Sequence, residues 1–222
     1  MHMIKYMIVL AALLLLIALL YNEKRESVKG ILSTKPFLST LFIITALIQP
    51  HPIPAYYHFI LTGLLLCMAG DICLAFTSRK MFMAGLVSFL LGHVLYIVAF
   101  FTTASIGTWT WVALLLSLVL SWIVYARLKP HLGTMKVPVI AYILIITLMV
   151  IGAATVLGDA GLAISGRIMV FIGAVSFYVS DIFVARQRFV AKEFVNRAAG
   201  LPLYNLGQFL LAFSVGALNL VA

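Results

Sequence analysis

Apolar blocks of about 20 residues follow one another along the whole chain, separated by short segments that carry charged residues, glycine or proline. A helix rises about 1.5 Å per residue, so each block is long enough to cross a hydrocarbon core of roughly 30 Å. We predict an all-α polytopic membrane protein that forms a single integral membrane domain over residues 1–222. Its eight expected spans are about 4–21, 31–49, 57–76, 82–101, 109–127, 137–157, 167–186 and 200–220.

Composition supports a membrane protein and excludes a soluble domain. The 222 residues are 64% hydrophobic and 9% charged, whereas soluble domains average roughly 45–50% and 25%. The net charge is +9, but the basic residues lie in short connections beside the apolar blocks. There they contact lipid headgroups and indicate orientation, so we expect no nucleic-acid partner. Cys67 and Cys73 lie six residues apart in one expected span, and no disulfide framework is indicated.

The distribution of lysine and arginine predicts how the chain sits in the membrane. Thirteen of the 15 basic residues fall in or beside the connections between spans 1 and 2, 3 and 4, 5 and 6, and 7 and 8, leaving only Lys5 and Arg167 on the other side. Because cytoplasmic loops carry the excess of positive charge, both termini are expected to face away from the cytoplasm. The expected location is a bacterial inner (cell) membrane.

Two of the six acidic residues fall inside expected spans, in similar local sequences. They are Asp71 in Gly-Asp-Ile-Cys-Leu-Ala and Asp181 in Ser-Asp-Ile-Phe-Val-Ala. A carboxylate near the middle of a membrane helix costs roughly 2.5–3.5 kcal/mol on insertion scales, so both demand a reason. The predicted orientation places them at similar depth in the cytoplasmic half, where they could face one cavity. The shared Asp-Ile-x-x-Ala leaves open whether the chain duplicates a four-helix repeat.

Paired carboxyl groups suit general acid–base hydrolysis. Two of them in one low-dielectric pocket do not both ionise cheaply, so one is expected to hold its proton as an acid beside a basic partner. Two other interpretations remain open. The aspartates could relay protons in a proton-coupled transporter of lipids or small molecules, or they could hydrogen-bond neighbouring helices in a binding or scaffold protein.

Further polar side chains lie at similar depth and are candidates for a substrate-binding polar cavity. Spans four and eight each present a polar face, and a lysine precedes a proline at the start of span two; the residues are Lys35, His93, Tyr96, Tyr204, Asn205 and Gln208. The residues of spans four and eight could equally be interhelical contacts, and Lys35 could be a plain interfacial anchor or a contact for a headgroup phosphate. Arg79 and Lys80 are candidates for binding a phosphate headgroup, or plain interfacial anchors. No paired metal-ligand spacing occurs, and we expect neither a metal nor a cofactor.

Taken in order, several short motifs resemble the YhhN-type membrane proteins, which include lysoplasmalogenase. They are Thr34-Lys35-Pro36, Gly70-Asp71, Gly92-His93-x-x-Tyr96, Gly173-Ala174 followed by Ser180-Asp181, and Tyr204-Asn205-x-x-Gln208. The resemblance covers nearly the whole chain. It implies hydrolysis of the vinyl-ether bond of a lysoplasmalogen, giving a fatty aldehyde and glycerophosphoethanolamine or glycerophosphocholine.

The resemblance also implies that the family's two acidic catalytic positions fall on Asp71 and Asp181. A vinyl ether cleaves after protonation of its outer alkene carbon, which requires a protonated carboxyl and a carboxylate, as in glycosidases. Asp71 lies farther from its basic loop than Asp181 does, which favours Asp71 as the acid. The expected partners are a lysophospholipid substrate and membrane lipids, and the sequence leaves the oligomeric state open.

Overall fold

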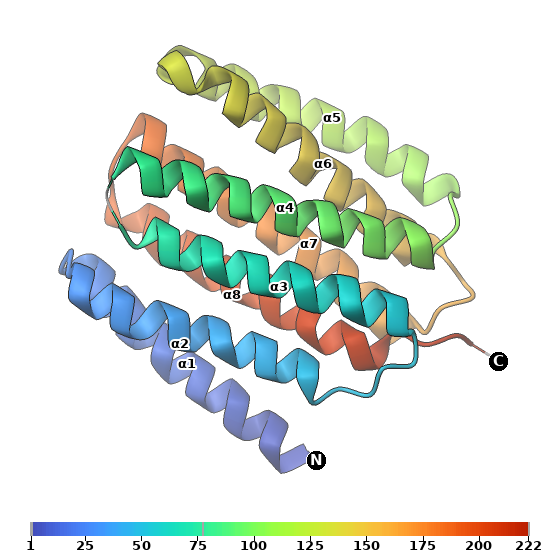
Figure 1. Cartoon of the computed structure of the whole chain (residues 1–222). Coiled ribbons are helices and arrows are strands. Elements are labelled where there is room, and N and C mark those ends of the chain that lie inside the picture. Colours follow the sequence, from blue (N-terminus) through green and yellow to red (C-terminus); the bar gives the residue numbers. More distant parts are fainter. Residues whose placement is uncertain (1, 77, 222) are drawn as a thin grey trace.

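The computed structural model describes residues 2–76 and 78–221, and this part of the chain is helical with no strand. Eight helices are long and apolar enough to cross a membrane (Figure 1), which confirms the predicted all-α polytopic architecture. They are α1 (His2–Lys24), α2 (Val28–Leu47), α3 (Pro54–Leu74), α4 (Arg79–Thr103), α5 (Thr108–Leu128), α6 (Lys136–Gly158), α7 (Ile164–Ala185) and α8 (Phe194–Ala217). Short 3-10 turns at Lys129–His131 and Gly133–Met135 precede α6, and a π turn at Arg186–Val190 follows α7.

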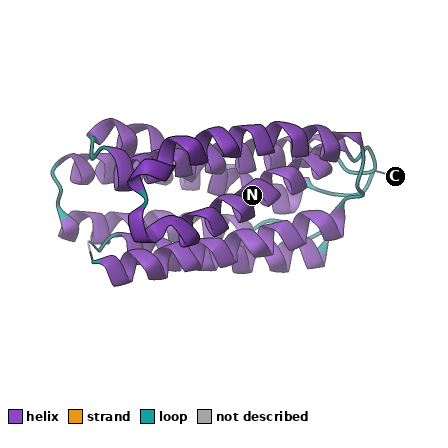
Figure 2. Ribbon diagram, turned by 90° about the horizontal axis from the view of Figure 1, so that it is seen from above, coloured by secondary structure: helices purple, strands orange, loops and turns teal. Residues whose placement is uncertain are grey.

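The helices run up and down through a bundle that is two layers thick (Figure 2). Along the bundle, α1 and α2 form one edge, α5 and α6 form the other, and α3, α4, α7 and α8 fill the centre (Figure 1). Large apolar side chains on α1 and α5 remain exposed, as expected for helices that face lipid. The largest fully buried side chains include Tyr56, Tyr96, Phe42, Phe100 and Phe177, so aromatic rings fill the middle of the bundle.

Close backbone contact joins α3 to α4. A Cβ atom built on Gly92 would lie 3.1 Å from the carbonyl oxygen of Gly63, and one built on Gly85 would lie 3.2 Å from that of Gly70. In addition, the Ser88 hydroxyl donates across the same interface to the Leu66 carbonyl at 2.6 Å. Small residues allow such close packing in membranes, where no hydrophobic driving force brings helices together.

The same contact recurs between α7 and α8. A Cβ on Gly207 would lie 2.8 Å from the Gly173 carbonyl oxygen, and one on Gly200 would lie 3.5 Å from that of Ser180. Positions in α7 follow their α3 counterparts by 110 residues, and the two glycines of α8 follow those of α4 by 115. The offset of 110 also relates Asp71 to Asp181. This shared register supports the interpretation of the chain as two four-helix repeats.

All eight described helices begin earlier than the sequence predicts, and the early starts of α2 and α8 affect the site. Residue Val28 rather than Ile31 opens α2, because the Ser27 hydroxyl caps the helix by accepting from the Gly30 amide at 3.2 Å. The expectation that Lys35-Pro36 occupies the first turn is therefore wrong, and Pro36 lies inside the helix, where it removes one backbone hydrogen bond. Helix α8 begins at Phe194 rather than at residue 200, which brings the preceding polar segment into the helix.

Candidate active site

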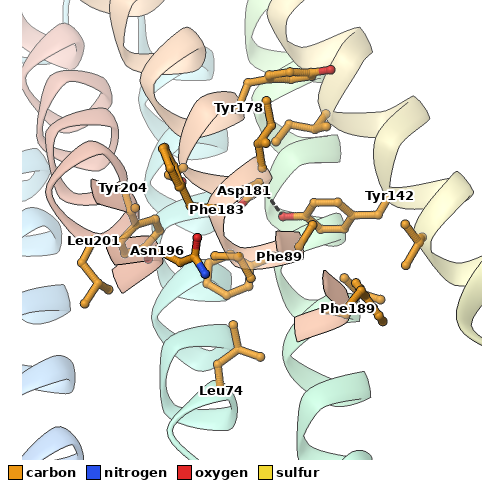
Figure 3. A pocket seen from close by; sticks show the side chains of 18 of the residues that line it. Leu74, Phe89, Tyr142, Tyr178, Asp181, Phe183, Phe189, Asn196, Leu201 and Tyr204 are labelled. Carbon is orange, nitrogen blue, oxygen red and sulfur yellow. Dashed lines mark hydrogen bonds between the residues drawn. The ribbon is translucent and has the colours of Figure 1, made fainter. Parts of the chain in front are cut away.

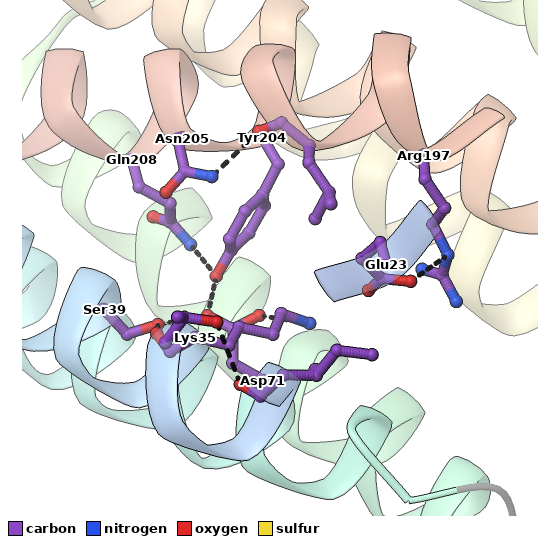
Figure 4. Close-up of polar contacts among 11 residues, drawn as sticks. Glu23, Lys35, Ser39, Asp71, Arg197, Tyr204, Asn205 and Gln208 are labelled. Atoms are coloured by element: carbon purple, nitrogen blue, oxygen red, sulfur yellow. Dashed lines mark hydrogen bonds and ion pairs between the residues drawn. The ribbon is translucent and has the colours of Figure 1, made fainter. Parts of the chain in front are cut away.

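Asp71 is buried near the C-terminal end of α3 and is surrounded by donors from α2 and α8. The Nζ atom of Lys35 lies 3.0 Å from Asp71 Oδ1. The other carboxylate oxygen, Oδ2, accepts from the Ser39 hydroxyl at 2.5 Å and from the Tyr204 hydroxyl at 2.6 Å (Figure 4). With an exposed fraction of only 1% for its side chain, a carboxylate at this position needs these partners, because an unpaired buried charge is very costly.

Asp71 Oδ1 keeps an unused acceptor site. Although Lys35 Nζ lies within ion-pair distance, the contact lacks the angles of a hydrogen bond, and no described residue donates to this oxygen. An ionised carboxylate oxygen accepts more than one hydrogen bond. Oδ1 therefore has spare acceptor capacity, although the atom itself is buried from solvent.

Asp181 has a different environment, in the matching turn of α7. Its Oδ2 accepts from the hydroxyl of Tyr142 on α6 at 2.6 Å (Figure 3), and no lysine, arginine or histidine among the described residues forms an ion pair with it. The residue is partly buried and lines a cavity. Asp71 thus has a cationic partner, whereas the charge of an ionised Asp181 would go unpaired.

Both aspartates line the same cavity, together with Lys35, Tyr142 and Tyr204. The cavity occupies about 1070 Å³, a figure that includes the open space at its mouth. Its remaining walls are mostly apolar side chains from α4 to α8, such as Leu86, Phe89, Val124, Leu128, Val139, Ile143, Ile146, Phe183 and Phe189. The arrangement offers apolar walls to an alkyl chain and two carboxyl groups in the same lining.

Only some of the polar residues that were expected to line the cavity do so. Lys35 and Tyr204 line the cavity with the aspartates. Gln208 donates to the Tyr204 hydroxyl at 3.2 Å and accepts from Tyr96 at 2.9 Å, so both lie behind Tyr204 as supports. The amide of Asn205 donates instead to a backbone carbonyl of its own helix.

His93 is fully buried among the rings of Tyr96, Tyr142 and Phe177. Neither ring nitrogen has a hydrogen-bond partner in the described part of the chain, and His93 does not line the cavity that holds the aspartates. Its contact with the Tyr142 ring, at 5.5 Å between centroids, makes it a neighbour of the Asp181 side of the site.

The two headgroup candidates lie outside the cavity. Arg79 donates to the exposed Thr134 hydroxyl at 3.0 Å, and Lys80 is exposed at the start of α4. Neither side chain is among the described residues that line the site. Their positions fit interfacial anchors, the second interpretation that the sequence left open.

Sequence reasoning missed two side chains that bind the aspartates. Ser39 lies four residues after Lys35, so the helical period alone puts the two on one face of α2 and gave a usable signal. Tyr142 had a weaker signal, namely a phenol six residues from the basic residue that begins α6. Tyr142 is therefore expected at the same depth as Asp181, but only the rotation of α6 in the structure shows that the two side chains meet. Within the described ranges, no three His, Cys, Asp or Glu side chains are grouped to hold a metal ion.

Comparison with known proteins gives one match. The model of the YhhN family matches residues 30–215, a segment that contains α3 to α7 entirely and most of α2 and α8. No curated protein and no solved structure matches the chain.

Proposed function

The chain belongs to the YhhN family, and we propose that it is an intramembrane lipid hydrolase, most simply a lysoplasmalogenase. The observation that carries this proposal is the unequal pair of carboxyl groups in one apolar cavity: Asp71 is ion-paired to Lys35, and Asp181 is bound only to a phenol. Such a pair provides one base and one acid at a single site. The substrate would be a lysoplasmalogen, and the products a fatty aldehyde and a glycerophospho-alcohol.

Asp71 is assigned as the base. The positive charge of Lys35 at 3.0 Å and the hydroxyl donors Ser39 and Tyr204 all favour the ionised carboxylate. The attacking water would give its proton to this carboxylate, of which the buried Oδ1 retains unused acceptor capacity. This assignment reverses the preference drawn from the distance to the basic loops, because the nearby cation outweighs the deeper burial.

Asp181 is assigned as the acid. Its cavity is mostly apolar, and no cation among the described residues forms an ion pair with Asp181, so the neutral carboxyl is the cheaper form there. A protonated carboxyl can accept from Tyr142 on Oδ2 and still donate from Oδ1. Tyr142 therefore orients the acidic proton without removing it.

The proposed reaction proceeds through an oxocarbenium ion. Asp181 gives its proton to the outer alkene carbon, and the carbon bound to the ether oxygen becomes cationic. The Asp71 carboxylate stabilises this cation and takes a proton from water as the water oxygen bonds to the same carbon. The resulting hemiacetal loses its glycerol oxygen, the hydroxyl proton moves to that oxygen, and an aldehyde forms. Transfer of one proton from Asp71 back to Asp181 restores the site.

The proposal is tested with purified protein reconstituted in lipid vesicles. We expect release of fatty aldehyde from lysoplasmenylethanolamine, and at least a 100-fold lower rate for Asp71→Asn and Asp181→Asn, the loss typical of removing a catalytic acid or base. Asp159→Asn provides the matched control, because Asp159 lies at the other end of the bundle and bonds only backbone amides. Its rate should stay within about 2-fold of the unmodified protein, the effect expected of a distant surface substitution.

Two outcomes would overturn the proposal. Full activity in either well-folded aspartate variant would remove the catalytic assignment. Transfer of intact lipid across the vesicle bilayer with no aldehyde formed would instead support the proton-coupled transporter, in which the same aspartates carry protons.

A further inference from the structure

A second, more polar cavity adjoins the first at the cytoplasmic end of the bundle, as the predicted orientation places it. It lies between the end of α1, the start of α2, the segment after the π turn and the start of α8, and it occupies about 860 Å³ including its open mouth. We call it the vestibule. Its charged lining residues are Glu23, Lys24, Glu26, Lys35, Lys192, Glu193 and Arg197.

The vestibule shares part of its wall with the cavity of the aspartates. Lys35, Leu74 and Arg197 line both spaces, and Figure 4 shows the Arg197–Glu23 and Lys35–Asp71 pairs in one view. A ligand that extends from the apolar cavity past Asp71 would therefore reach the charged vestibule. An apolar cavity followed by a charged one suits an amphiphile with a long chain and a charged headgroup.

Charges of both signs line the vestibule. Four basic residues are mixed with three of the six acidic residues of the whole chain. A site for a simple anion would need only the cations. The mixture is complementary to a zwitterion, which presents a phosphate and an ammonium group a few atoms apart.

Arg197 is suited to the phosphate. Its Nε atom is buried and has no hydrogen-bond partner in the described part of the chain, although Glu23 Oε2 lies 3.3 Å away as an ion pair. A guanidinium has five N–H donors in a planar fork that matches phosphate oxygens. Most of that capacity is unused here, and Arg197 lies where the two cavities meet.

Glu23 is suited to the ammonium group. Its side chain is 11% exposed, in contrast to Glu26 at 70% and Glu193 at 50%, so it is the deepest carboxylate of the vestibule. A primary ammonium has three N–H donors for such a carboxylate, whereas a quaternary ammonium has none. Quaternary groups favour cages of several aromatic rings, and of the described residues that line the vestibule only Phe194 is aromatic.

We propose that the vestibule is a headgroup site for zwitterionic lysophospholipids with a primary amine, in which Arg197 binds the phosphate and Glu23 binds the ammonium group. The proposal rests on the function proposed above and narrows its substrate to the phosphoethanolamine class. The glycerol would then lie by Lys35 and Leu74, and the bond to be cleaved by Asp71 and Asp181. In this proposal Arg197 replaces Arg79 and Lys80 as the cationic contact of the headgroup.

The test measures binding without turnover. The probe is an alkyl-ether lysophospholipid, which has no vinyl ether to cleave, with a fluorophore at the end of its chain; anisotropy is measured on the full chain in detergent micelles. We expect at least about 5-fold tighter binding of the ethanolamine form than of the choline form, a difference of about 1 kcal/mol. Glu23→Gln should reduce this preference to less than 2-fold. Arg197→Gln should weaken both forms about 10-fold or more, as the loss of a charge-assisted contact to phosphate implies.

Matched controls separate headgroup binding from general effects. Arg127→Gln removes an exposed arginine at the same end of the bundle, outside both cavities, and should leave both affinities unchanged. Soluble glycerophosphoethanolamine should displace the probe better than inorganic phosphate at equal concentration. Arg197→Lys, which keeps the cation, provides a second variant if Arg197→Gln fails to fold, and it should weaken binding less than 10-fold.

The headgroup assignment would be overturned by an unchanged preference in folded Glu23→Gln. Unchanged affinity in folded Arg197→Gln, or a gain of affinity in Arg197→Lys, would also overturn it. So would equal displacement of the probe by phosphate and by glycerophosphoethanolamine. The probe is not a substrate, so its binding is read independently of aldehyde release. Hydrolysis without a headgroup preference would remove the vestibule site alone. Selective binding without hydrolysis would remove the catalytic proposal alone.

Discussion

Lys35 and Asp71 form an ion pair inside the membrane bundle, with 3.0 Å between Nζ and Oδ1 and exposed fractions of 8% and 1% for the two side chains. Each charge makes the other tolerable, because removal of one partner from a buried pair leaves an uncompensated charge. The pair also fixes the difference between the two aspartates. Asp71 has a cation, and Asp181 has a tyrosine.

Replacing Lys35 with methionine should impair both stability and activity. The substitution removes the cation and leaves the buried Asp71 carboxylate with only hydroxyl donors, at a cost of about 3–5 kcal/mol. We expect a lower melting temperature and a fall in aldehyde release on the order of 100-fold, since a single electrostatic contact of this kind contributes about that much. Lys35→Arg should recover part of both, and equal thermal stability of Lys35→Met and the unmodified protein would contradict the ion pair.

Tyr142→Phe should slow turnover while leaving the fold intact. Without the phenol, Asp181 loses its 2.6 Å donor and the fixed orientation of its acidic proton, and we expect about a 10-fold lower kcat from the loss of one hydrogen bond to the reacting group. Tyr56→Phe is the matched control, because it loses an equally short bond to Ser214 near the opposite end of the bundle. If both variants slowed turnover equally, Tyr142 would have no special role.

Hydrolysis in D₂O should place one deuterium on the aldehyde, on the carbon next to the carbonyl group. Protonation of the outer alkene carbon by Asp181 requires this label, because the acid exchanges its proton with solvent between turnovers. Rapid reduction of the aldehyde to the alcohol, followed by mass spectrometry, measures the label before it can exchange. An unlabelled product would exclude the oxocarbenium route.

Gly207→Ala should destabilise the bundle, because its Cβ would lie 2.8 Å from the carbonyl oxygen of Gly173. Separation of α7 and α8 is the only way to relieve this contact, and overpacking of this kind costs about 1–3 kcal/mol. Gly107→Ala meets no atom within 4 Å and should cost less. Thermal unfolding of the two variants in the same detergent gives the comparison, and equal melting temperatures would contradict the close helix contact.

Labelling of single cysteines should establish the orientation. In a background without Cys67 and Cys73, Ile106→Cys should react with a membrane-impermeant maleimide in intact bacterial cells. His131→Cys, at the other end of the bundle, should react only after permeabilisation. The expectation follows from the excess of basic residues at that end. The reverse pattern would place the active site in the outer half of the membrane.

The sequence predicted the eight spans because an apolar block of membrane length has few other solutions. It also predicted that Asp71 and Asp181 lie at similar depth, since the basic residues fix the direction of each helix and the helical rise fixes the distance along it. The cavity that both residues line follows from these two arguments once α8 packs against both α3 and α7 in the centre of the bundle.

The residues that distinguish the aspartates could not be predicted in the same way. Tyr142 reaches Asp181 only because of how α6 is rotated about its axis, and an almost uniformly apolar helix gives no sign of that rotation. Arg197 was expected in a loop, because the apolar run of α8 begins at about residue 200. The helix begins at Phe194 instead, and this added turn directs Arg197 into the vestibule.

The spacing of the contacts along the chain bears on how the protein is made. Asp71 enters the bilayer on α3 before α8, which carries Tyr204 133 residues later, has been synthesised. Lys35 and Ser39 precede Asp71 on α2, so they can receive the carboxylate as soon as α3 leaves the insertion machinery. Tyr204 arrives last and completes the shell of donors. The Lys35–Asp71 ion pair can thus compensate the charge of Asp71 during membrane insertion, before Tyr204 is available.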